Sequence, residues 1–375
     1  MKLYIVSNYP AKDDGVSEYT QELLDVLKQN NLNIISRKIF FYDQKRDMFL
    51  WFKFFFEVLI IKPDIVHVQY TPTICGPILP LFFMLLKFSR ITTKLVLTTH
   101  EKTTAYSHHF NHFIKNLFIL YEKMIFNFCD KIIVHTEEHK EELSRYTKTR
   151  LNKIEIIPHP ITERHEINPI QKEKVIKKYN LNNKTIIAYF GFIRPNKGME
   201  YLINAFPKVL EKKGNLILLI AGIEPKEWRG YLNKLEELVK INGVGKYVRI
   251  TGYMPEDEIP VIFSLSEIIV MPLLIHTTNS RALHRAISYN KPVIITDLGS
   301  GTVSEIVKRY NIGCVVPPRD SRAIADAILG MLDNPEEMEM FRKNELKVAE
   351  ELSQKNIAKM HIDLYADLIN SGCEK

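Results

Sequence analysis

Two cations and two glycines lie close together between residues 189 and 198, and this combination can hold a diphosphate. Gly191 ends an apolar run that is typical of a buried parallel strand, and a helical pattern begins directly after the stretch. Arg194 and Lys197 lie between these two elements. Unpaired charge is expensive to remove from water, so two cations at a strand end indicate an anionic partner. The alternative is a surface ion pair with Glu200, which we consider the weaker interpretation.

A second glycine turn follows the first predicted strand. Gly15 would allow a close backbone approach, and the helix predicted to follow it would offer unpaired amides to an anion. The alternative is a plain turn in which Ser17 caps the helix. The residues favour neither interpretation.

Histidines gather after the strand predicted at Lys94–Thr99. The imidazole of His100 could bond a sugar hydroxyl or transfer a proton near neutral pH, or it could be an ordinary surface histidine. His108 and His112 have the i, i+4 spacing of metal ligands on a helix, but no acidic pattern accompanies them. We therefore predict no metal site and no metal cofactor.

Small polar residues precede another predicted helix in the second half of the chain. Their amides and hydroxyls could bind a diphosphate, or one of them could simply cap the helix. The residues concerned are Thr277, Thr278, Asn279 and Ser280.

Composition limits the class of protein. The chain has 375 residues, enough for two domains, and its 46% hydrophobic and 25% charged content is typical of a folded protein. The four cysteines have no paired spacing, which favours a reduced cytoplasmic location. The net charge of +7 is compatible with anionic substrates or an anionic membrane surface. No motif for nucleic-acid binding is present.

Two apolar runs, Met48–Ile61 and Gly76–Phe88, are shorter than the roughly 20 residues that cross a bilayer. Buried helices are the favoured interpretation. Interfacial helices beside a basic surface remain the alternative, and would allow peripheral association with the inner membrane face.

Strand and helix patterns alternate along the whole chain, which predicts an α/β fold with two doubly wound, Rossmann-like domains. A polar linker separates them. The expected domains are residues 1–165 and 178–350, and a final charged amphipathic stretch covers Pro335–Ile369. Strands are predicted at Lys2–Ser7, Asp64–Gln69, Lys94–Thr99, Lys131–Thr136, Lys153–Ile157, Thr185–Phe190, Leu216–Ala221, Val248–Thr251, Glu267–Met271, Pro292–Thr296 and Gly313–Val316.

Motifs along nearly the full chain resemble those of the retaining nucleotide-sugar glycosyltransferases of family 4. Each motif is common by itself, but their order and spacing together are specific. They are Tyr9–Pro10, Gly15–Val16, Lys62–Val68, Thr99–His100, Cys129–Thr136, Ile156–Pro160, Phe190–Gly198 and the block 267–305. The resemblance implies the GT-B architecture, with two domains facing a central cleft. It also implies that a helix at about 354–372 crosses back to the first domain.

The resemblance assigns roles to the candidate residues. Arg194 and Lys197 would hold the donor diphosphate and stabilise the leaving nucleotide without a metal. Gly15 and Gly191 would lie beside the donor, and His100 beside the reacting sugar. The amino-terminal domain would bind the acceptor and the carboxyl-terminal domain the nucleotide sugar.

This sequence departs from the family at an acidic pair. The family carries two glutamates eight positions apart, near the donor sugar and the ribose, and alignment on Lys291–Ile294 puts His276 and His284 there. A histidine can bond a hydroxyl but cannot supply a carboxylate's charge. In addition, Phe192 occupies a position where many relatives have an arginine. Arg194, two residues further along the chain, would take the role of that arginine.

The sequence therefore predicts a retaining enzyme that moves a hexose from a nucleoside-diphosphate sugar to a hydroxyl acceptor. That acceptor could be a glycan, a lipid-linked glycan or a small molecule. The alternative is a GT-B-shaped binding or partner subunit that has lost its chemistry along with the acidic pair.

Overall fold

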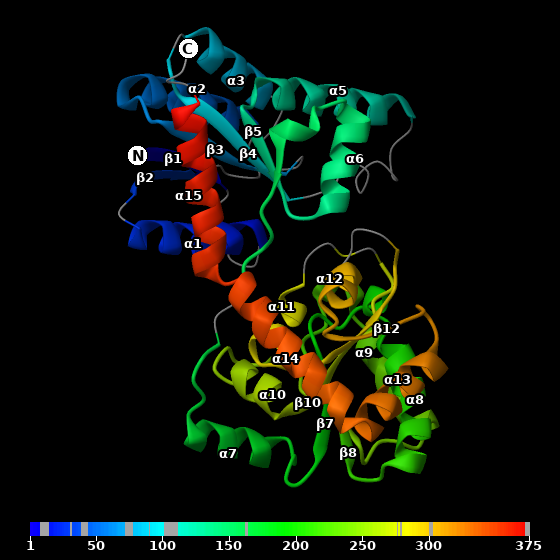
Figure 1. Ribbon diagram of the computed structural model, residues 1–375. Coiled ribbons are helices and arrows are strands. Elements are labelled where there is room, and N and C mark those ends of the chain that lie inside the picture. The colour runs from blue at the N-terminus through cyan, green and yellow to red at the C-terminus, as the bar shows by residue number, and fades with distance from the viewer. Residues whose placement is uncertain are drawn as a thin grey trace. The chain divides into compact units, whose positions relative to one another are not determined.

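The computed structural model describes residues 1–7, 15–30, 32–38, 44–71, 78–89, 91–100, 112–161, 164–275, 277, 280–299 and 303–371. The chain divides into two compact units (Figure 1). Unit 1 comprises Met1–Pro160 together with Gln354–Lys375, and unit 2 comprises Ile161–Ser353. His108, Thr278, Asn279 and His276 lie outside the described residues.

Unit 1 is built on a six-stranded parallel sheet in the order β2-β1-β3-β4-β5-β6. Its strands are β1 (Lys2–Ser7), β2 (Asn33–Lys38), β3 (Ile65–Tyr70), β4 (Lys94–Thr99), β5 (Lys131–Val134) and β6 (Ile154–Ile156). Its helices are α1 (Gly15–Gln29), α2 (Gln44–Ile61), α3 (Leu79–Phe88), α5 (His112–Phe128), α6 (Glu137–Thr147) and α15 (Gln354–Asn370).

Side chains alternate across this sheet because successive residues of a strand point to opposite faces. In β3, Val66, Val68 and Tyr70 belong to the apolar core that also contains Trp51 of α2 and Phe82 of α3. The intervening polar side chains of the strand therefore face the other layer, which contains α1 and α15. The helices α1 and α15 pack against each other, although they come from opposite ends of the chain (Figure 1).

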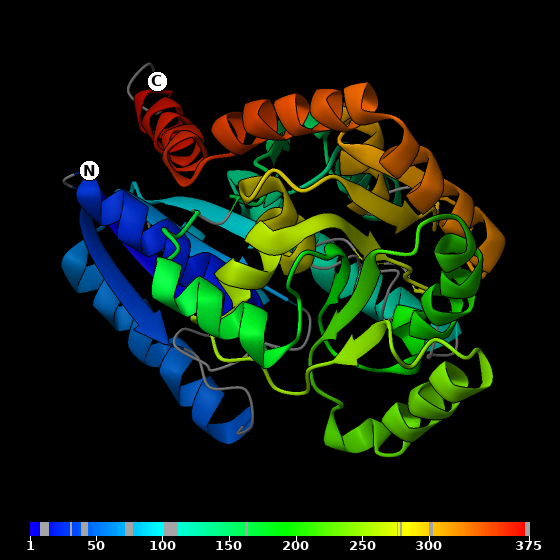
Figure 2. The ribbon, with the colours of Figure 1, turned by 90° about the horizontal axis from the view of Figure 1, so that it is seen from below.

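Unit 2 repeats this plan with a parallel sheet in the order β12-β11-β10-β7-β8-β9. Its strands are β7 (Thr185–Phe190), β8 (Leu216–Ala221), β9 (Val248–Ile250), β10 (Ser266–Met271), β11 (Val293–Thr296) and β12 (Gly313–Val316). Its helices are α7 (Pro169–Lys178), α8 (Met199–Lys212), α9 (Tyr231–Ile241), α10 (Ile259–Leu265), α11 (Arg281–Ser288), α12 (Val303–Tyr310), α13 (Ser321–Asp333) and α14 (Pro335–Glu351). Figure 2 shows the orange α13 and α14 beside the green and yellow strands of this unit.

The predicted alternation of strands and helices is confirmed, with one correction. The strand β2 was not predicted, because it is an edge strand whose side chains are largely half-buried and it lacks the apolar run of a buried strand. The final amphipathic stretch contains two helices, and the second agrees with the helix expected at about 354–372. Asn334 caps α14 by accepting a hydrogen bond from the Glu337 amide, and α15 begins after a break at residues 352–353.

Candidate functional site

The strand order of unit 2 reverses at one point, between β7 and β10. The loops that follow these two strands therefore start side by side, at the place where doubly wound sheets bind ligands. A hydrogen bond of 3.0 Å from the Leu274 amide to the Asn196 carbonyl joins the two loops. The sheet thus brings the 191–198 stretch together with the start of the loop after β10.

The cation pair lies in a short turn between β7 and α8. Ile193 donates its amide to the Ile223 carbonyl, 2.8 Å away, and so continues the pairing with the neighbouring chain segment. Residues Pro195–Lys197 then form a 3-10 turn, and Gly198, at φ 64°, connects it to α8. The positive φ is why a glycine occupies this junction.

Among the residues that the structure describes, neither cation of this turn forms an ion pair with a carboxylate. Within the same part of the chain, the Arg194 Nε is buried without a hydrogen-bond partner. Burial, and then the charge of Arg194, lowers the pKa of Lys197 to about 8. The alternative interpretation, an ion pair with Glu200, is not found: the partner that the structure gives this carboxylate is the Tyr231 hydroxyl, which donates to it.

The loop after β10 is described in part. The Ser280 Oγ accepts from the Leu283 amide at 3.3 Å, so this hydroxyl caps α11. Thr277 donates its hydroxyl to the Ile275 carbonyl at 3.1 Å, and its own carbonyl accepts from the Val303 amide at 2.9 Å. His284 lies buried on α11. The helix-capping interpretation is thus confirmed for Ser280.

The amino-terminal candidates lie in unit 1. Gly15 is the first residue of α1, and residues 8–14, which precede it, are outside the described chain. Ser17 is buried within the first turn of α1 rather than preceding the helix, so its interpretation as the capping residue is wrong. His112 begins α5, but its side chain is not described.

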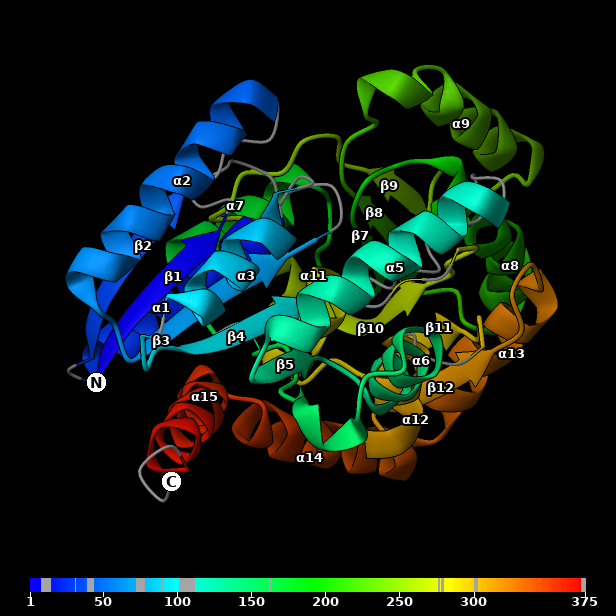
Figure 3. The same ribbon diagram turned by 90° about the horizontal axis from the view of Figure 1, so that it is seen from above.

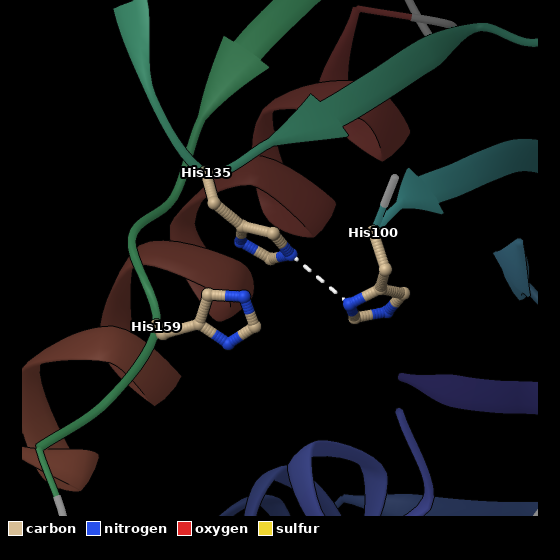
Figure 4. A group of neighbouring side chains, drawn as sticks. All are labelled: His100, His135 and His159. Carbon is tan, nitrogen blue, oxygen red and sulfur yellow. Dashed lines mark hydrogen bonds between the residues drawn. The ribbon is translucent and has the colours of Figure 1, made fainter. Parts of the chain in front are cut away.

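His100, His135 and His159 form a cluster at the carboxyl edge of the unit 1 sheet (Figure 4). One nitrogen of each ring lies within 4.8 Å of the others. The His135 Nε2 is 3.2 Å from the His100 Nδ1, and the rings of His135 and His159 have centroids 3.8 Å apart. The ring of Tyr19 packs edge-on against all three imidazoles. This cluster is named the histidine cluster below.

In His135 and His100, the ring nitrogen that does not face the other imidazole has a fixed partner. The His135 Nδ1 lies 2.8 Å from the Ile157 carbonyl, and the His100 Nε2 lies 2.8 Å from the Gln69 Oε1. Burial lowers the pKa of His135 to about 4. Burial, and then the proximity of His135, holds the pKa of His100 well below its usual value. Both imidazoles are therefore neutral at physiological pH.

A second network connects α15 to the sheet beneath the histidine cluster. The His67 Nδ1 lies 2.7 Å from the Tyr365 hydroxyl, and the His67 Nε2 lies 2.7 Å from the Thr98 hydroxyl. His361 of α15 bonds the Tyr19 hydroxyl at 2.9 Å. These groups are buried, so their mutual hydrogen bonds replace part of those lost to water. Within the described residues, the His361 Nδ1 is buried without a partner.

Sequence reasoning treated His100 alone and missed the cluster. His135 and His159 are 35 and 59 residues from His100 in the sequence, with no short spacing to indicate a common site. A signal was present nevertheless, because a histidine follows directly or closely after β4, β5 and β6. These three strands are neighbours in one parallel sheet, so their carboxyl ends meet.

An apolar surface covers α2, α3 and α5, which lie next to one another on one face of the unit 1 sheet (Figure 3). Its side chains are exposed, with 70% of Phe49, 60% of Phe56 and 81% of Ile60 accessible. The full set is Phe49, Phe52, Phe56 and Ile60 of α2, Leu81 and Phe88 of α3, and Leu117, Leu120 and Met124 of α5. This set is named the apolar face. The favoured interpretation of α2 as a buried helix is therefore wrong for one side of the helix.

No helix within the described ranges is both long and apolar enough to span a membrane. The apolar face is instead a stripe on helices whose opposite sides are buried. On α2, Trp51, Phe54 and Val58 are buried in the core.

Two protein families match the chain. The family described as Glycosyltransferase Family 4 matches residues 9–164, and the family described as Glycosyl transferases group 1 matches residues 171–348. Together the two matches cover most of both units.

Curated relatives match over shorter stretches. An alpha-D-kanosaminyltransferase of Streptomyces kanamyceticus is 25% identical over 215 residues, which are 57% of this chain and 54% of that protein. The chain thus spans about half the length of this relative.

Solved structures match the whole fold. A sucrose-phosphate synthase from Thermosynechococcus elongatus superimposes with a TM-score of 0.73 at 19% identity, covering 99% of both chains. Anabaena HepE, crystallised in complex with UDP, has a TM-score of 0.73 at 14% identity and covers 98% of this chain and 99% of its own. The predicted two-domain GT-B fold is confirmed.

Proposed function

Because the chain belongs to the group 1 and family 4-like glycosyltransferases of GT-B fold, we propose that it transfers a hexose from a nucleoside-diphosphate sugar to a hydroxyl acceptor. The reaction breaks the bond from the anomeric carbon to the diphosphate and forms a bond from that carbon to the acceptor oxygen. We propose retention of the anomeric configuration, by likeness to the family.

The buried and unpartnered Nε of Arg194 carries this proposal. A buried Nε without a partner has lost its hydrogen bond to water without replacing it, and an anion at the switch point would restore that bond. Lys197 lies three residues on, with its pKa lowered towards neutrality by burial and by Arg194. A diphosphate would satisfy both groups at once.

These two cations also fit the chemistry of the leaving group. Negative charge accumulates on the diphosphate as its bond to the sugar breaks, and fixed cations stabilise that charge most where water is excluded. We propose that this stabilisation needs no metal ion. His100 is proposed to contact the sugar. Its Nε2 lies 2.8 Å from the Gln69 Oε1 and its Nδ1 lies 3.2 Å from the His135 Nε2, so a sugar hydroxyl would replace one of these two partners.

For the acceptor, we propose a lipid-linked glycan at the cytoplasmic membrane face. The apolar face exposes aromatic and aliphatic side chains over three adjacent helices, and exposed apolar side chains gathered in this way mark interaction surfaces. Exposed Lys53 and Lys123 lie on two of these helices and would favour anionic lipid headgroups.

Donor binding and turnover test the proposal together. The full chain would be screened for thermal stabilisation by nucleoside-diphosphate sugars, and the best donor then used to follow release of the nucleoside diphosphate. A donor at 100 times its Kd should stabilise the fold by about 2.7 kcal/mol. The double variant Arg194→Ala/Lys197→Ala should lose this stabilisation, whereas Arg322→Ala, at an exposed arginine of α13, should keep it.

Two results would count against the proposal. If no nucleotide sugar stabilises the protein, the diphosphate site is wrong. If a donor binds at Arg194 and Lys197 but neither hydrolysis nor transfer follows with any acceptor, the chain is a binding subunit.

A further inference from the structure

We propose that the histidine cluster binds one divalent transition-metal ion of the zinc class, with His100, His135 and His159 as its ligands. Imidazole nitrogens suit zinc, copper and nickel, and three protein ligands with a fourth open position are a common zinc arrangement. The proposal rests on the geometry of unit 1 alone.

Hydrogen-bond partners favour one tautomer for His135 and one for His100. The carbonyl oxygen of Ile157 can only accept, so the His135 Nδ1 carries a proton and its Nε2 presents a lone pair to the His100 Nδ1, 3.2 Å away. With the Gln69 Oε1 as acceptor, the His100 Nε2 carries the proton and the His100 Nδ1 also presents a lone pair. In this tautomer the two nitrogens cannot bond each other, and a cation between them would bind both.

The spacing of these nitrogens fits a metal ion. Two zinc–nitrogen bonds of 2.0–2.1 Å at a tetrahedral angle place the nitrogens about 3.3 Å apart. The observed separation of 3.2 Å agrees with this value, and the third imidazole has a nitrogen within the 4.8 Å limit of the group.

The hydrogen-bond acceptors of the proposed ligand histidines are of the kind found around metal sites. Metal-bound imidazoles usually donate their second ring N–H to a carbonyl or a carboxylate, which orients the ring. The Ile157 carbonyl and the Gln69 amide oxygen occupy these positions.

The three histidines are partly exposed rather than fully buried. Tyr19 packs its ring against them, but its hydroxyl bonds His361 and so does not serve as a ligand. The fourth position would be taken by water or by an oxygen of a small ligand.

The ligands of this ion all belong to unit 1. The ion would occupy the Nδ1 of His100, the residue that is proposed to contact the sugar. We therefore expect the ion to inhibit transfer, and a chelator to leave the rate unchanged or to raise it.

Calorimetric titration of the chelator-stripped full chain with zinc chloride tests the site without any activity assay. We expect one ion per chain, with a Kd at or below the micromolar range. His135→Ala and His159→Ala should each weaken binding at least tenfold, because each removes one ligand. His165→Ala, at an exposed histidine of unit 2, is the matched control and should change nothing.

Cobalt(II) gives an independent readout. A site with three imidazoles should give the intense visible absorption of tetrahedral cobalt, and His135→Gln should abolish it while the circular dichroism of the folded chain is unchanged. The proposal is overturned if zinc does not bind at micromolar concentration. It is equally overturned if the cluster variants bind as tightly as the unsubstituted protein.

Discussion

The carbonyl oxygen of Pro272 lies 2.1 Å from the position that a Cβ on Gly198 would occupy. This close approach holds the turn after β7 against the loop after β10. The cation pair precedes Gly198 directly, so the position of Arg194 and Lys197 depends on a residue that has no side chain.

Replacing Gly198 should therefore damage both the fold and the site. We expect Gly198→Ala to lower the free energy of unfolding by about 2 to 4 kcal/mol, because alanine is strained at this positive φ and overlaps backbone atoms. Donor affinity should fall with it. Chemical denaturation and donor titration measure the two effects.

Gly330→Ala is the control for this substitution. Gly330 lies in α13 and a Cβ there meets nothing within 4 Å. Because glycine is a poor helix former, the change should stabilise the chain by about 0.5 to 1 kcal/mol. A neutral Gly198→Ala would contradict the close packing of the two loops.

The lowered pKa of Lys197 predicts a pH dependence of donor binding. In the free protein this amine is protonated below about pH 8 and neutral above it. A bound diphosphate favours the ammonium and raises its pKa, so binding takes up a proton near pH 8. Affinity for a nucleoside diphosphate should fall about tenfold between pH 7 and pH 9. Calorimetry in buffers of different ionisation enthalpy measures both quantities.

Arg194→Gln should shift this profile to higher pH. Removal of the Arg194 charge leaves burial as the remaining cause of the low pKa of Lys197, so the Lys197 amine stays protonated further into the alkaline range. Overall affinity should fall by about 10- to 100-fold with the loss of a charge-assisted bond. Arg322→Gln should alter neither the profile nor the affinity. An unshifted profile would show that another group titrates.

The contact between His67 and Tyr365 should contribute to the packing of α15 on the sheet of unit 1. Tyr365→Phe removes the partner of a buried imidazole nitrogen and should cost about 1 to 3 kcal/mol of unfolding free energy. Tyr253→Phe, at a hydroxyl exposed to solvent, should stay within about 0.5 kcal/mol. Equal stabilities of the two variants in thermal denaturation would argue against this hydrogen bond.

The apolar face predicts binding to anionic vesicles. We expect the chain to float with liposomes that contain phosphatidylglycerol, and the double variant Phe56→Ser/Ile60→Ser to lose at least tenfold in partitioning, because two exposed apolar side chains no longer enter the interface. Ile241→Ser changes an equally exposed residue of α9 in unit 2 and should have no effect. If the unsubstituted chain does not float, a membrane-bound acceptor is excluded as the partner of this face.

Local patterns in the sequence determined the positions of the buried strands and of the cation pair. Apolar runs of four to six residues marked the buried strands, because a strand covered on both faces must be apolar throughout. The cation pair was also recognisable from the sequence, because Arg194, Lys197 and the two glycines around them lie within a turn of only eight residues. The edge strand β2 was missed because its residues are only partly buried.

Tertiary structure alone decided which distant residues meet. His100, His135 and His159 form one cluster only because β4, β5 and β6 are adjacent, and the order of strands is set by long-range packing rather than by any local pattern. The contact of α15 with His67 across 298 residues has the same origin. The sequence could name the cations of the site, but only the folded chain shows that the Nε of Arg194 is buried without a partner.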